Sequence, residues 1–445
     1  MSWVVHTGDW IEVLRTLPDN SVHCVITSPP YWGLRDYGTA EWEGGSESCD
    51  HQKAGARRQL PHGDGRKNDF YADNRVLIPG AGAVYKGICG KCGAIRRGAQ
   101  LGLERTPEDY IDKITAGFRE VRRVLRKDGT LWLNMGDCYQ SGSRGGYGRN
   151  RTGVSKNLGN VASDFTAAPS RMSVAGLKDK DLVMIPARAA LALQADGWWL
   201  RQDIIWSKPN PMPESVTDRC TRAHEYIFLL TKSKRYFYDA EAVKEKSTCD
   251  RMRGTAPYEQ VPDGGDNSGL AHRESNGSRN RRSVWEITTV SFPKAHRATF
   301  PPKLVEPCIL AGTSERGCCP QCGAPWERIT EKTVRFESGS GKAGNPPNGK
   351  NGRDYEQATS GDYDIRMGPV TETKTVGWQP ACTCNAGEPI ACTILDPFAG
   401  AGTAGLVARR LGRNFIGIEL KAEYADMARQ RIAQDAPLFN GEQAP

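Results

Sequence analysis

The segment from Ala391 to Gln434 constrains the fold more than any other part of the chain. A short apolar run, Cys392 to Leu395, predicts a strand, and the turn D-P-F-A-G-A-G-T (residues 396–403) follows it directly. Residues 403–411 have the spacing of a helix, and Phe415 to Glu419 that of a second strand. A strand, a glycine-rich turn, a helix and a strand in this order predict an α/β fold whose turn holds a ligand.

The same turn indicates the kind of ligand. Its glycines let the backbone approach a ligand closely, and the helix that follows offers unpaired N–H groups. Glu419 ends the next strand, where nucleotide-binding units place an acid on the ribose hydroxyls. The pattern is not G-x-G-x-x-G, and Asp396 would repel a pyrophosphate. We therefore expect a cofactor with a cationic centre and no phosphates, the alternative being a turn that is only structural.

A second strand end carries side chains suited to chemistry on a nucleobase. The apolar run Val22 to Thr27 stops at Ser28-Pro29-Pro30-Tyr31. An exocyclic amine is a poor nucleophile because its lone pair is conjugated into the ring. Acceptors on its N–H bonds, here the Ser28 hydroxyl and the Pro29 carbonyl, would free that lone pair, and Tyr31 would stack on the flipped base. The alternative is a Pro-Pro turn that only caps a buried strand.

Together the two segments resemble the motifs of the DNA N4-cytosine and N6-adenine methyltransferases. D-P-F-A-G-A-G-T resembles that family's S-adenosylmethionine motif, and S-P-P-Y matches its catalytic motif (D/N/S)-P-P-(Y/F). The catalytic motif comes first in this chain, which is the order of the β class. The resemblance implies a Rossmann-like S-adenosylmethionine-dependent methyltransferase sheet with circularly permuted motif order. It also implies methyl transfer to the exocyclic amine of a base flipped from double-stranded DNA.

The resemblance implies roles for individual residues. The methionine end of S-adenosylmethionine would be lined by Asp396, Phe398, Gly400, Gly402 and Thr403. Glu419 would hold the ribose, and Asp9 would accept from the adenine amino group of the cofactor. The catalytic residues would be Ser28, Pro29, Pro30 and Tyr31. Residues 204–210 and 224–238 resemble the strands beside the target pocket.

The target base is left open between two choices. Ser28 stands where adenine enzymes usually carry an acid, so we favour N4 of cytosine, with N6 of adenine as the alternative. A lower alternative is a zinc-containing DNA-binding protein with an inactive methyltransferase domain. RNA or protein-glutamine methylation ranks low because those enzymes usually place the cofactor motif first. A C5-cytosine enzyme is rejected because Cys308, in the only Pro-Cys pair, lies in an apolar segment that predicts a buried helix.

Composition fits an α/β core interrupted by polar insertions, since only 38% of the 445 residues are hydrophobic, with Gly 49 and Pro 27. Further predicted elements are a helix that begins at Thr106-Pro107, a strand over 130–134, a helix over 186–196, and strands over 198–206, 225–231 and 236–238. The expected units are residues 1–38 and 103–240 (catalytic half of the core), 39–102 (zinc insertion), 241–298 (target recognition), 299–317 and 388–445 (cofactor-binding half), and 318–387 (second zinc insertion).

The cysteines and the charge indicate a metal and a partner. Two C-x-x-C-G turns, each with a second ligand pair, predict two structural zinc sites formed by Cys49, His51, Cys89 and Cys92 and by Cys319, Cys322, Cys382 and Cys384. Unconnected thiols and a redox role are the alternatives. The net charge of +8 permits a nucleic-acid partner, and the Arg-bearing stretches 141–171 and 246–282 are the expected DNA contacts.

No apolar run approaches the roughly 18 residues of a membrane span, and Met1-Ser2-Trp3 opens no signal peptide. We therefore expect neither a membrane protein nor a secreted one. The family resemblance implies a cytoplasmic, nucleoid-associated protein of a bacterium or phage. A cognate restriction endonuclease is an expected candidate partner, and the oligomeric state is open.

Overall fold

The computed structural model describes residues 2–33, 41–51, 58–59, 75–76, 89–97, 100–104, 106–140, 176–246, 278–290, 300–336 and 369–435. The predicted DNA-contacting stretch 141–171 and most of 246–282 lie outside these residues. The chain forms two compact units. The first comprises Met1–Phe237, Ser283–Gly312 and Ala391–Pro445, and the second comprises Tyr238–Arg282 and Thr313–Ile390.

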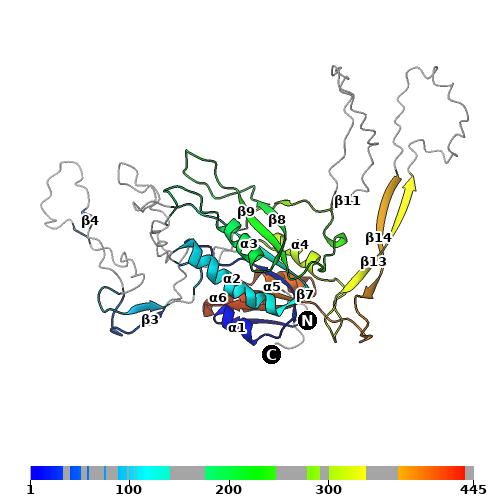
Figure 1. Ribbon diagram of the computed structural model, residues 1–445, viewed down its shortest axis with the longest axis horizontal. Helices are drawn as coiled ribbons and strands as arrows, with labels where there is room; N and C mark the ends of the chain where they lie inside the picture. Colours follow the sequence, from blue (N-terminus) through cyan, green and yellow to red (C-terminus); the bar gives the residue numbers. More distant parts are fainter. Residues whose placement is uncertain are drawn as a thin grey trace, which may run out of the picture. The chain divides into compact units, whose positions relative to one another are not determined.

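The first unit is built on an eight-stranded sheet in the order β1-β16-β15-β2-β7-β9-β8-β12. Three of these strands, β7, β8 and β9, are labelled in Figure 1. Its strands are β1 (Trp3–Thr7), β2 (Val22–Thr27), β7 (Leu125–Met135), β8 (Trp199–Ser207), β9 (His224–Thr231), β12 (Val284–Glu286), β15 (Thr393–Asp396) and β16 (Asn414–Glu419). All neighbours are parallel except β9, which is antiparallel to β7 and β8. This mixed sheet confirms the predicted α/β fold class. The carboxyl ends of its parallel strands therefore lie along one edge.

Helices cover both faces of the sheet. The helices of one layer, packed in sequence against one another, are α1 (Trp10–Thr16), α2 (Pro107–Val124) and α3 (Ile185–Ala195). The helices of the other layer are α4 (Pro302–Gly312), α5 (Thr403–Arg410) and α6 (Ala422–Gln434). Val25 of β2 joins the core beneath the first layer. Its neighbour Cys24 faces α4, where a Cβ on Gly312 would lie 2.8 Å from the Cys24 Sγ. Alternate residues of one strand thus contact opposite layers.

The start of α2 confirms the predicted helix signal. The Thr106 hydroxyl accepts a hydrogen bond from the Asp109 N–H at 3.1 Å, and Pro107 occupies the first turn. The helix ends at Val124, and β7 begins at Leu125 rather than at the predicted residue 130. The strand extends because Leu125 already pairs with Val22 of β2.

The strand predicted over 236–238 is wrong. The structure has no strand there, and the Phe237 N–H donates to the Asp128 carbonyl at 2.8 Å. The apolar run in β9 pairs with β7 along one edge and with β8 along the other. Both edges of β9 are therefore occupied, and residues 236–238 have no place beside it.

In the second unit, the described residues form two antiparallel strand pairs. These are β10 (Glu245–Lys246) with β11 (Ser278–Arg279), and β13 (Trp326–Phe336) with β14 (Pro369–Pro380). A short 3-10 helix, η1, spans Glu241–Val243. The Arg328 guanidinium donates to Asp239 at 2.9 Å and lies 4.4 Å from the Trp378 ring centroid. This largely buried ion pair and its stacking hold the hairpin β13–β14 to the segment that begins at residue 238.

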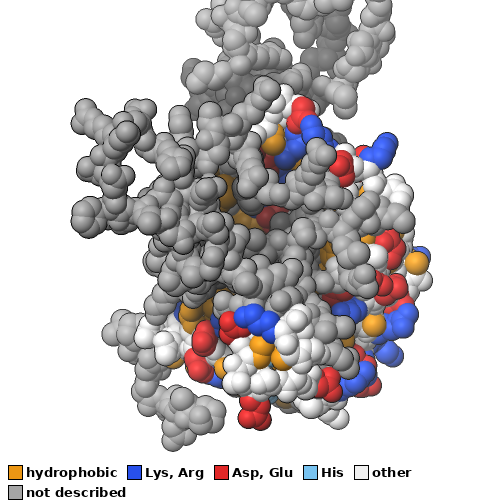
Figure 2. All heavy atoms as spheres, turned by 90° about the vertical axis from the view of Figure 1, so that its left-hand side faces the viewer, with side chains coloured by type: hydrophobic (Ala, Val, Ile, Leu, Met, Phe, Trp, Pro, Cys, Tyr) orange, Lys and Arg blue, Asp and Glu red, His pale blue; other side chains and the backbone are white. Residues whose placement is uncertain are grey.

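Surface charge is mixed where it can be seen. Among the described atoms in Figure 2, Lys and Arg side chains lie interspersed with Asp and Glu rather than in one basic patch.

Short strand pairs, β3 (Glu41–Glu43) with β6 (Ile95–Arg97) and β4 (Arg58–Gln59) with β5 (Arg75–Val76), complete the described elements of the first unit. None of the helices in the described ranges combines the length and hydrophobicity of a membrane span.

Candidate active site

The predicted site residues meet along one edge of the sheet because each follows or ends a parallel strand. The positions are Asp9 after β1, Glu419 at the end of β16, Asp396 at the end of β15 and Ser28 after β2. The chain leaves β15 through α5 toward β16, whereas from β2 it continues through α2 to β7 on the other side. The order of strands therefore reverses between Asp396 and Ser28. In open α/β sheets this switch point is where ligands bind.

Asp396 is buried and only partly hydrogen-bonded. Its Oδ1 accepts from the Thr27 hydroxyl at 2.7 Å and from the Phe398 N–H at 3.0 Å. Its Oδ2 is buried with no partner among the described residues. Burial raises the pKa of this carboxyl to about 7, and nearby Glu419 adds to the rise against the opposing hydrogen bonds. A buried, unpaired carboxylate oxygen at a switch point is suited to a cationic group.

The loop after β15 is fixed on the end of β16. The Glu419 carboxylate accepts from the Gly400 N–H and from the Lys421 N–H, each at 2.9 Å. Burial raises the pKa of Glu419, and these N–H groups oppose the rise. Gly402 has a φ of 73° just before α5, and a Cβ there would lie 2.9 Å from the Cβ of Ala428. Glycine is therefore required at 402 for both backbone conformation and close packing.

Three other predicted cofactor residues have partners within the chain. The Phe398 ring lies 4.7 Å from the Trp10 ring. The Thr403 hydroxyl accepts from the Arg431 guanidinium at 2.9 Å. The Asp9 Oδ1 caps α1 by accepting from the Ile11 and Glu12 N–H groups at 2.9 and 3.1 Å. All three lie at the same edge of the sheet as Asp396 and Glu419, and each side chain also stabilises the loop or helix that carries it.

A polar cluster surrounds the predicted catalytic segment. The Ser28 hydroxyl donates to the Tyr31 hydroxyl at 3.1 Å, and the Tyr31 hydroxyl donates to Glu225 Oε2 at 2.7 Å. The Asn134 amide donates to the Tyr31 hydroxyl at 2.9 Å and to Glu225 Oε2 at 3.0 Å. Lys208 pairs with the other oxygen of Glu225. The cluster joins the ends of β2, β7, β8 and β9.

The prolines and the tyrosine ring are held rigidly. Pro29 is buried, and the Pro30 carbonyl accepts from the Tyr110 hydroxyl at 2.9 Å. A Cβ on Gly136 would lie 2.6 Å from the Tyr31 Cε2, so only glycine leaves room for this ring. Burial, with the charge of Glu225, raises the pKa of Tyr31 well above its usual value. The Tyr31 hydroxyl therefore keeps its proton at neutral pH.

Three members of this cluster have no role in the sequence prediction. Asn134 lies in the predicted strand 130–134, and Lys208 and Glu225 lie in the segments predicted beside the target pocket. The available signal is a polar residue at the end of an apolar strand, as Asn134 is after Leu131 to Leu133. That signal is weak because surface strand ends are commonly polar.

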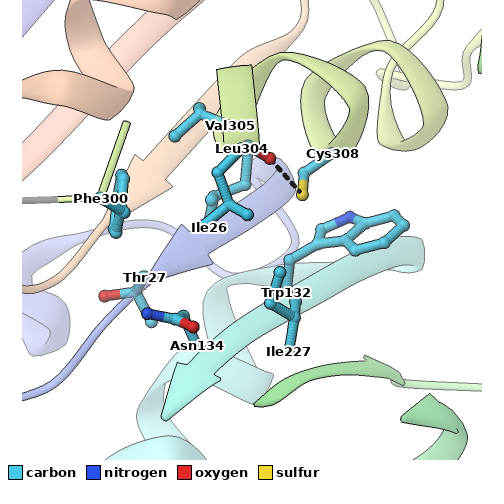
Figure 3. A pocket seen from close by; sticks show the side chains of 9 residues that line it. All are labelled: Ile26, Thr27, Trp132, Asn134, Ile227, Phe300, Leu304, Val305 and Cys308. Atoms are coloured by element: carbon cyan, nitrogen blue, oxygen red, sulfur yellow. Dashed lines mark hydrogen bonds between the residues drawn. The ribbon is translucent and has the colours of Figure 1, made fainter. Parts of the chain in front are cut away.

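A small pocket lies beside the cluster. Its lining is mostly apolar and comes from β2, β7, β9, α4 and the segment just before α4, namely Ile26, Thr27, Trp132, Asn134, Ile227, Phe300, Leu304, Val305 and Cys308. Figure 3 shows Thr27 and Asn134 side by side, and a dashed line marks the hydrogen bond between Cys308 and Leu304. Asn134 Oδ1 is buried and has no partner in the described ranges. Cys308 is buried inside α4, as predicted, and its thiol donates to the Leu304 carbonyl.

The cysteine clusters predicted from spacing are each brought together. The ligand atoms of Cys49, His51, Cys89 and Cys92 all lie within 4.8 Å of one another, and so do those of Cys319, Cys322, Cys382 and Cys384. In the first cluster the Cys92 Sγ lies 3.5 Å from the His51 Nδ1. The His51 ring stacks on Trp42 at 4.2 Å, which fixes its orientation. Three thiols with an imidazole in the first cluster, and four thiols in the second, suit tetrahedral zinc.

Both clusters contain the same turn. In each, the first cysteine N–H donates to the carbonyl of the alanine after the glycine, and the glycine N–H donates back to that cysteine's carbonyl. All four bonds measure 2.8 Å and involve Cys89, Gly93 and Ala94 and Cys319, Gly323 and Ala324. Backbone N–H groups lower the pKa of the Cys92 thiol to about 6 and that of the Cys319 thiol to about 7. One thiol of each turn is therefore favoured as the thiolate, the form that binds metals.

The chain also matches known proteins along most of its length. A family model described as DNA methylase, covering N6 and N4 methyltransferases, matches residues 22–319 and 389–430. The chain belongs to this DNA methylase family. The methylase is 33% identical to the Type II methyltransferase M.Cfr9I of Citrobacter freundii over 425 residues, which cover 96% of this chain and 86% of the relative. This membership confirms the family predicted from the two motifs.

Two further comparisons also cover nearly the whole chain. The methylase is 34% identical to the Type II methyltransferase M.XycI of Xanthomonas campestris pv. cyanopsidis, again over 425 residues, 96% of this chain and 86% of the relative. Among solved structures, the putative DNA modification methylase TTHA0409 of Thermus thermophilus, complexed with S-adenosyl-L-methionine, aligns at 18% identity with a TM-score of 0.41. That alignment covers 98% of this chain and 97% of the other.

Proposed function

We propose that this DNA methylase transfers a methyl group from S-adenosylmethionine to N4 of a cytosine flipped from double-stranded DNA. The observation that carries the proposal is the position of the Ser28 hydroxyl. It lies in a half-buried polar cluster at the switch point of the sheet, one strand away from Asp396. Methyl donor and acceptor sites on neighbouring strand ends are what a direct transfer requires.

The residues at β15 and β16 fit this cofactor. The unpaired Asp396 Oδ2 would hold its cationic amino group, and the Glu419 carboxylate, set by two N–H groups, would hold the ribose. Asp9 would accept from the adenine amino group, with the loop residues Gly400 and Gly402 leaving room for the methionine end. When bound, S-adenosylmethionine supplies a methyl group activated by a sulfonium.

The catalytic segment would make the amine nucleophilic. The Ser28 hydroxyl and the Pro29 carbonyl would accept its two N–H bonds, so that its lone pair is no longer conjugated into the ring. The amine nitrogen then forms the new N–C bond as the S–C bond breaks and its electrons stay on sulfur. The methylated amine releases its extra proton to water. No side chain has to serve as a strong base.

The choice of cytosine rests on Ser28, which stands where adenine enzymes usually carry an acid. N6 of adenine is the alternative, because both bases present a similar edge.

A non-catalytic DNA-binding role is a lower alternative. It is disfavoured because the hydrogen bonds around Ser28 and Asp396 are intact. The stretches 141–171 and 246–282 are proposed DNA contacts, and a cognate restriction endonuclease is a proposed partner.

Structural zinc belongs to the same proposal. Each cysteine cluster would hold one ion, by Cys49, His51, Cys89 and Cys92 and by Cys319, Cys322, Cys382 and Cys384. The strands beside them are short or lie on a two-stranded hairpin, and such elements are marginally stable by themselves. Metal binding would supply the missing stability.

The test combines methyl transfer with cofactor binding. Radiolabelled methyl transfer to DNA should occur with the native protein and be lost in Ser28→Ala, while calorimetry shows unchanged S-adenosylmethionine affinity for that variant. Asp396→Ala should instead weaken cofactor binding. Transfer that survives in Ser28→Ala, or unchanged affinity in Asp396→Ala, would contradict the assignment.

A further inference from the structure

We infer that Glu225 is a positioning residue whose charge turns the Ser28 hydroxyl into an obligate hydrogen-bond acceptor. The inference rests on the proposed function, because it explains how a serine can take the place of a catalytic acid. Glu225 lies at the amino end of β9, far along the chain from Ser28, and it reaches the catalytic segment only through the fold.

The direction of each hydrogen bond follows from counting hydrogens. The Tyr31 hydroxyl has one hydrogen, which goes to Glu225 Oε2 at 2.7 Å, the shortest contact that this hydroxyl makes. The Tyr31 oxygen can then only accept, and it does so from Ser28 at 3.1 Å and from Asn134 at 2.9 Å. The single Ser28 hydrogen is therefore committed to Tyr31. The Ser28 oxygen can then only accept: the Asn134 amide donates to it at 3.4 Å, and its other lone pair is left to accept from a substrate amine.

Lys208 and Asn134 keep Glu225 in the acceptor role. Lys208 pairs with Oε1, while Asn134 donates to Oε2 at 3.0 Å together with Tyr31. All three neighbours are donors, and a carboxylate can only accept. The side chains of the ion pair are 18% and 17% exposed, so water competes little for these contacts. Lys208 also lies 4.3 Å above the Trp206 ring, which restrains it.

An amide at position 225 would reverse the pattern. Lys208 would attract the Gln carbonyl, so the Gln NH₂ group would face Tyr31 and Asn134, which are themselves donors. The Tyr31 hydrogen would then turn toward Ser28, and Ser28 would present its own hydrogen to the substrate instead of a lone pair. A Ser28 hydroxyl that donates would face the amine with hydrogen against hydrogen. The amine N–H bond would then have no acceptor.

The test is Glu225→Gln against Glu331→Gln, an exposed glutamate of the hairpin strand β13. At saturating DNA and S-adenosylmethionine, kcat should fall about 10- to 100-fold in Glu225→Gln, the range of a lost charge-assisted hydrogen bond. The KM for S-adenosylmethionine and the melting temperature should stay near those of the control. Adding Ser28→Asp to Glu225→Gln should raise kcat again at least about fivefold. A carboxylate can only accept hydrogen bonds, whichever way the Tyr31 hydroxyl points.

Tyr31→Phe provides a second test should Glu225→Gln fold poorly. This variant keeps the aromatic ring but removes the hydroxyl that links Ser28 to Glu225. Its kcat should fall as that of Glu225→Gln does. Wild-type kcat in either variant, or no recovery with Ser28→Asp in the Glu225→Gln background, would overturn the inference. Failure of the proposed function is separate, because the native protein would then methylate no DNA amine at all.

Discussion

The Thr27 hydroxyl donates a hydrogen bond of 2.7 Å to Asp396, and this contact joins the catalytic strand β2 to the cofactor strand β15. Both residues are almost fully buried. The bond lies between the proposed methyl donor and acceptor sites and holds two strand ends at a fixed separation. Its loss should therefore affect stability and cofactor binding together.

Thr27→Val keeps the side-chain shape but removes the donor. We expect the free energy of unfolding to fall by about 1–3 kcal/mol, because the buried carboxylate loses a partner. The control is Thr115→Val, since the Thr115 hydroxyl is buried in α2 with no partner among the described residues. That variant should be neutral or slightly stabilising. Urea unfolding measures both, and equal losses would contradict the role given to this bond.

Stability without cofactor should depend on pH through Asp396. Burial raises its pKa from 3.8 to about 7, so between these values the folded protein holds a proton that the unfolded chain has released. The free energy of unfolding should therefore decrease as pH rises through this window, by up to about 1.4 kcal/mol per pH unit. Asp396→Asn should remove this part of the decrease. Urea unfolding at about pH 5 and pH 8 measures it, and an identical decrease in the variant would refute it.

The sequence identifies the site residues that occur in contiguous motifs at strand ends. Asp396, Glu419 and Ser28 are found this way because parallel strands bring such ends to one edge. The sequence does not identify Glu225 and Lys208 as site residues, because each is a single polar residue in or beside a strand. Which residue each of them contacts depends on the order of the strands in the sheet. That order, with β9 between β7 and β8, also explains why no strand forms over 236–238.

Elemental analysis should find two zinc ions per chain. Cys92→Ser and Cys322→Ser should each lose one ion and lower the melting temperature, since each removes one of four ligands. Cys220→Ser is the matched control, because Cys220 is exposed and outside both clusters. Native protein purified without chelator that contains no zinc would rule out both sites.

Gly136→Ala should impair catalysis by displacing the Tyr31 ring, which would lie 2.6 Å from the new Cβ. We expect kcat to fall about tenfold or more, with little change in cofactor affinity. Gly377→Ala is the control, because among the described residues its Cβ would meet only Ile329 Cδ1, at 3.7 Å. Steady-state kinetics compares them, and native kcat in Gly136→Ala would mean that the ring position is unimportant.

Mass spectrometry of nucleosides from DNA treated with the native protein and S-adenosylmethionine tests the central claim most directly. The account predicts N4-methylcytosine with the native protein and no methylated nucleoside with Ser28→Ala. N6-methyladenine as the only product would contradict the assignment of the base. The absence of any methylated nucleoside under conditions where the native protein binds DNA and cofactor would contradict the proposed reaction itself.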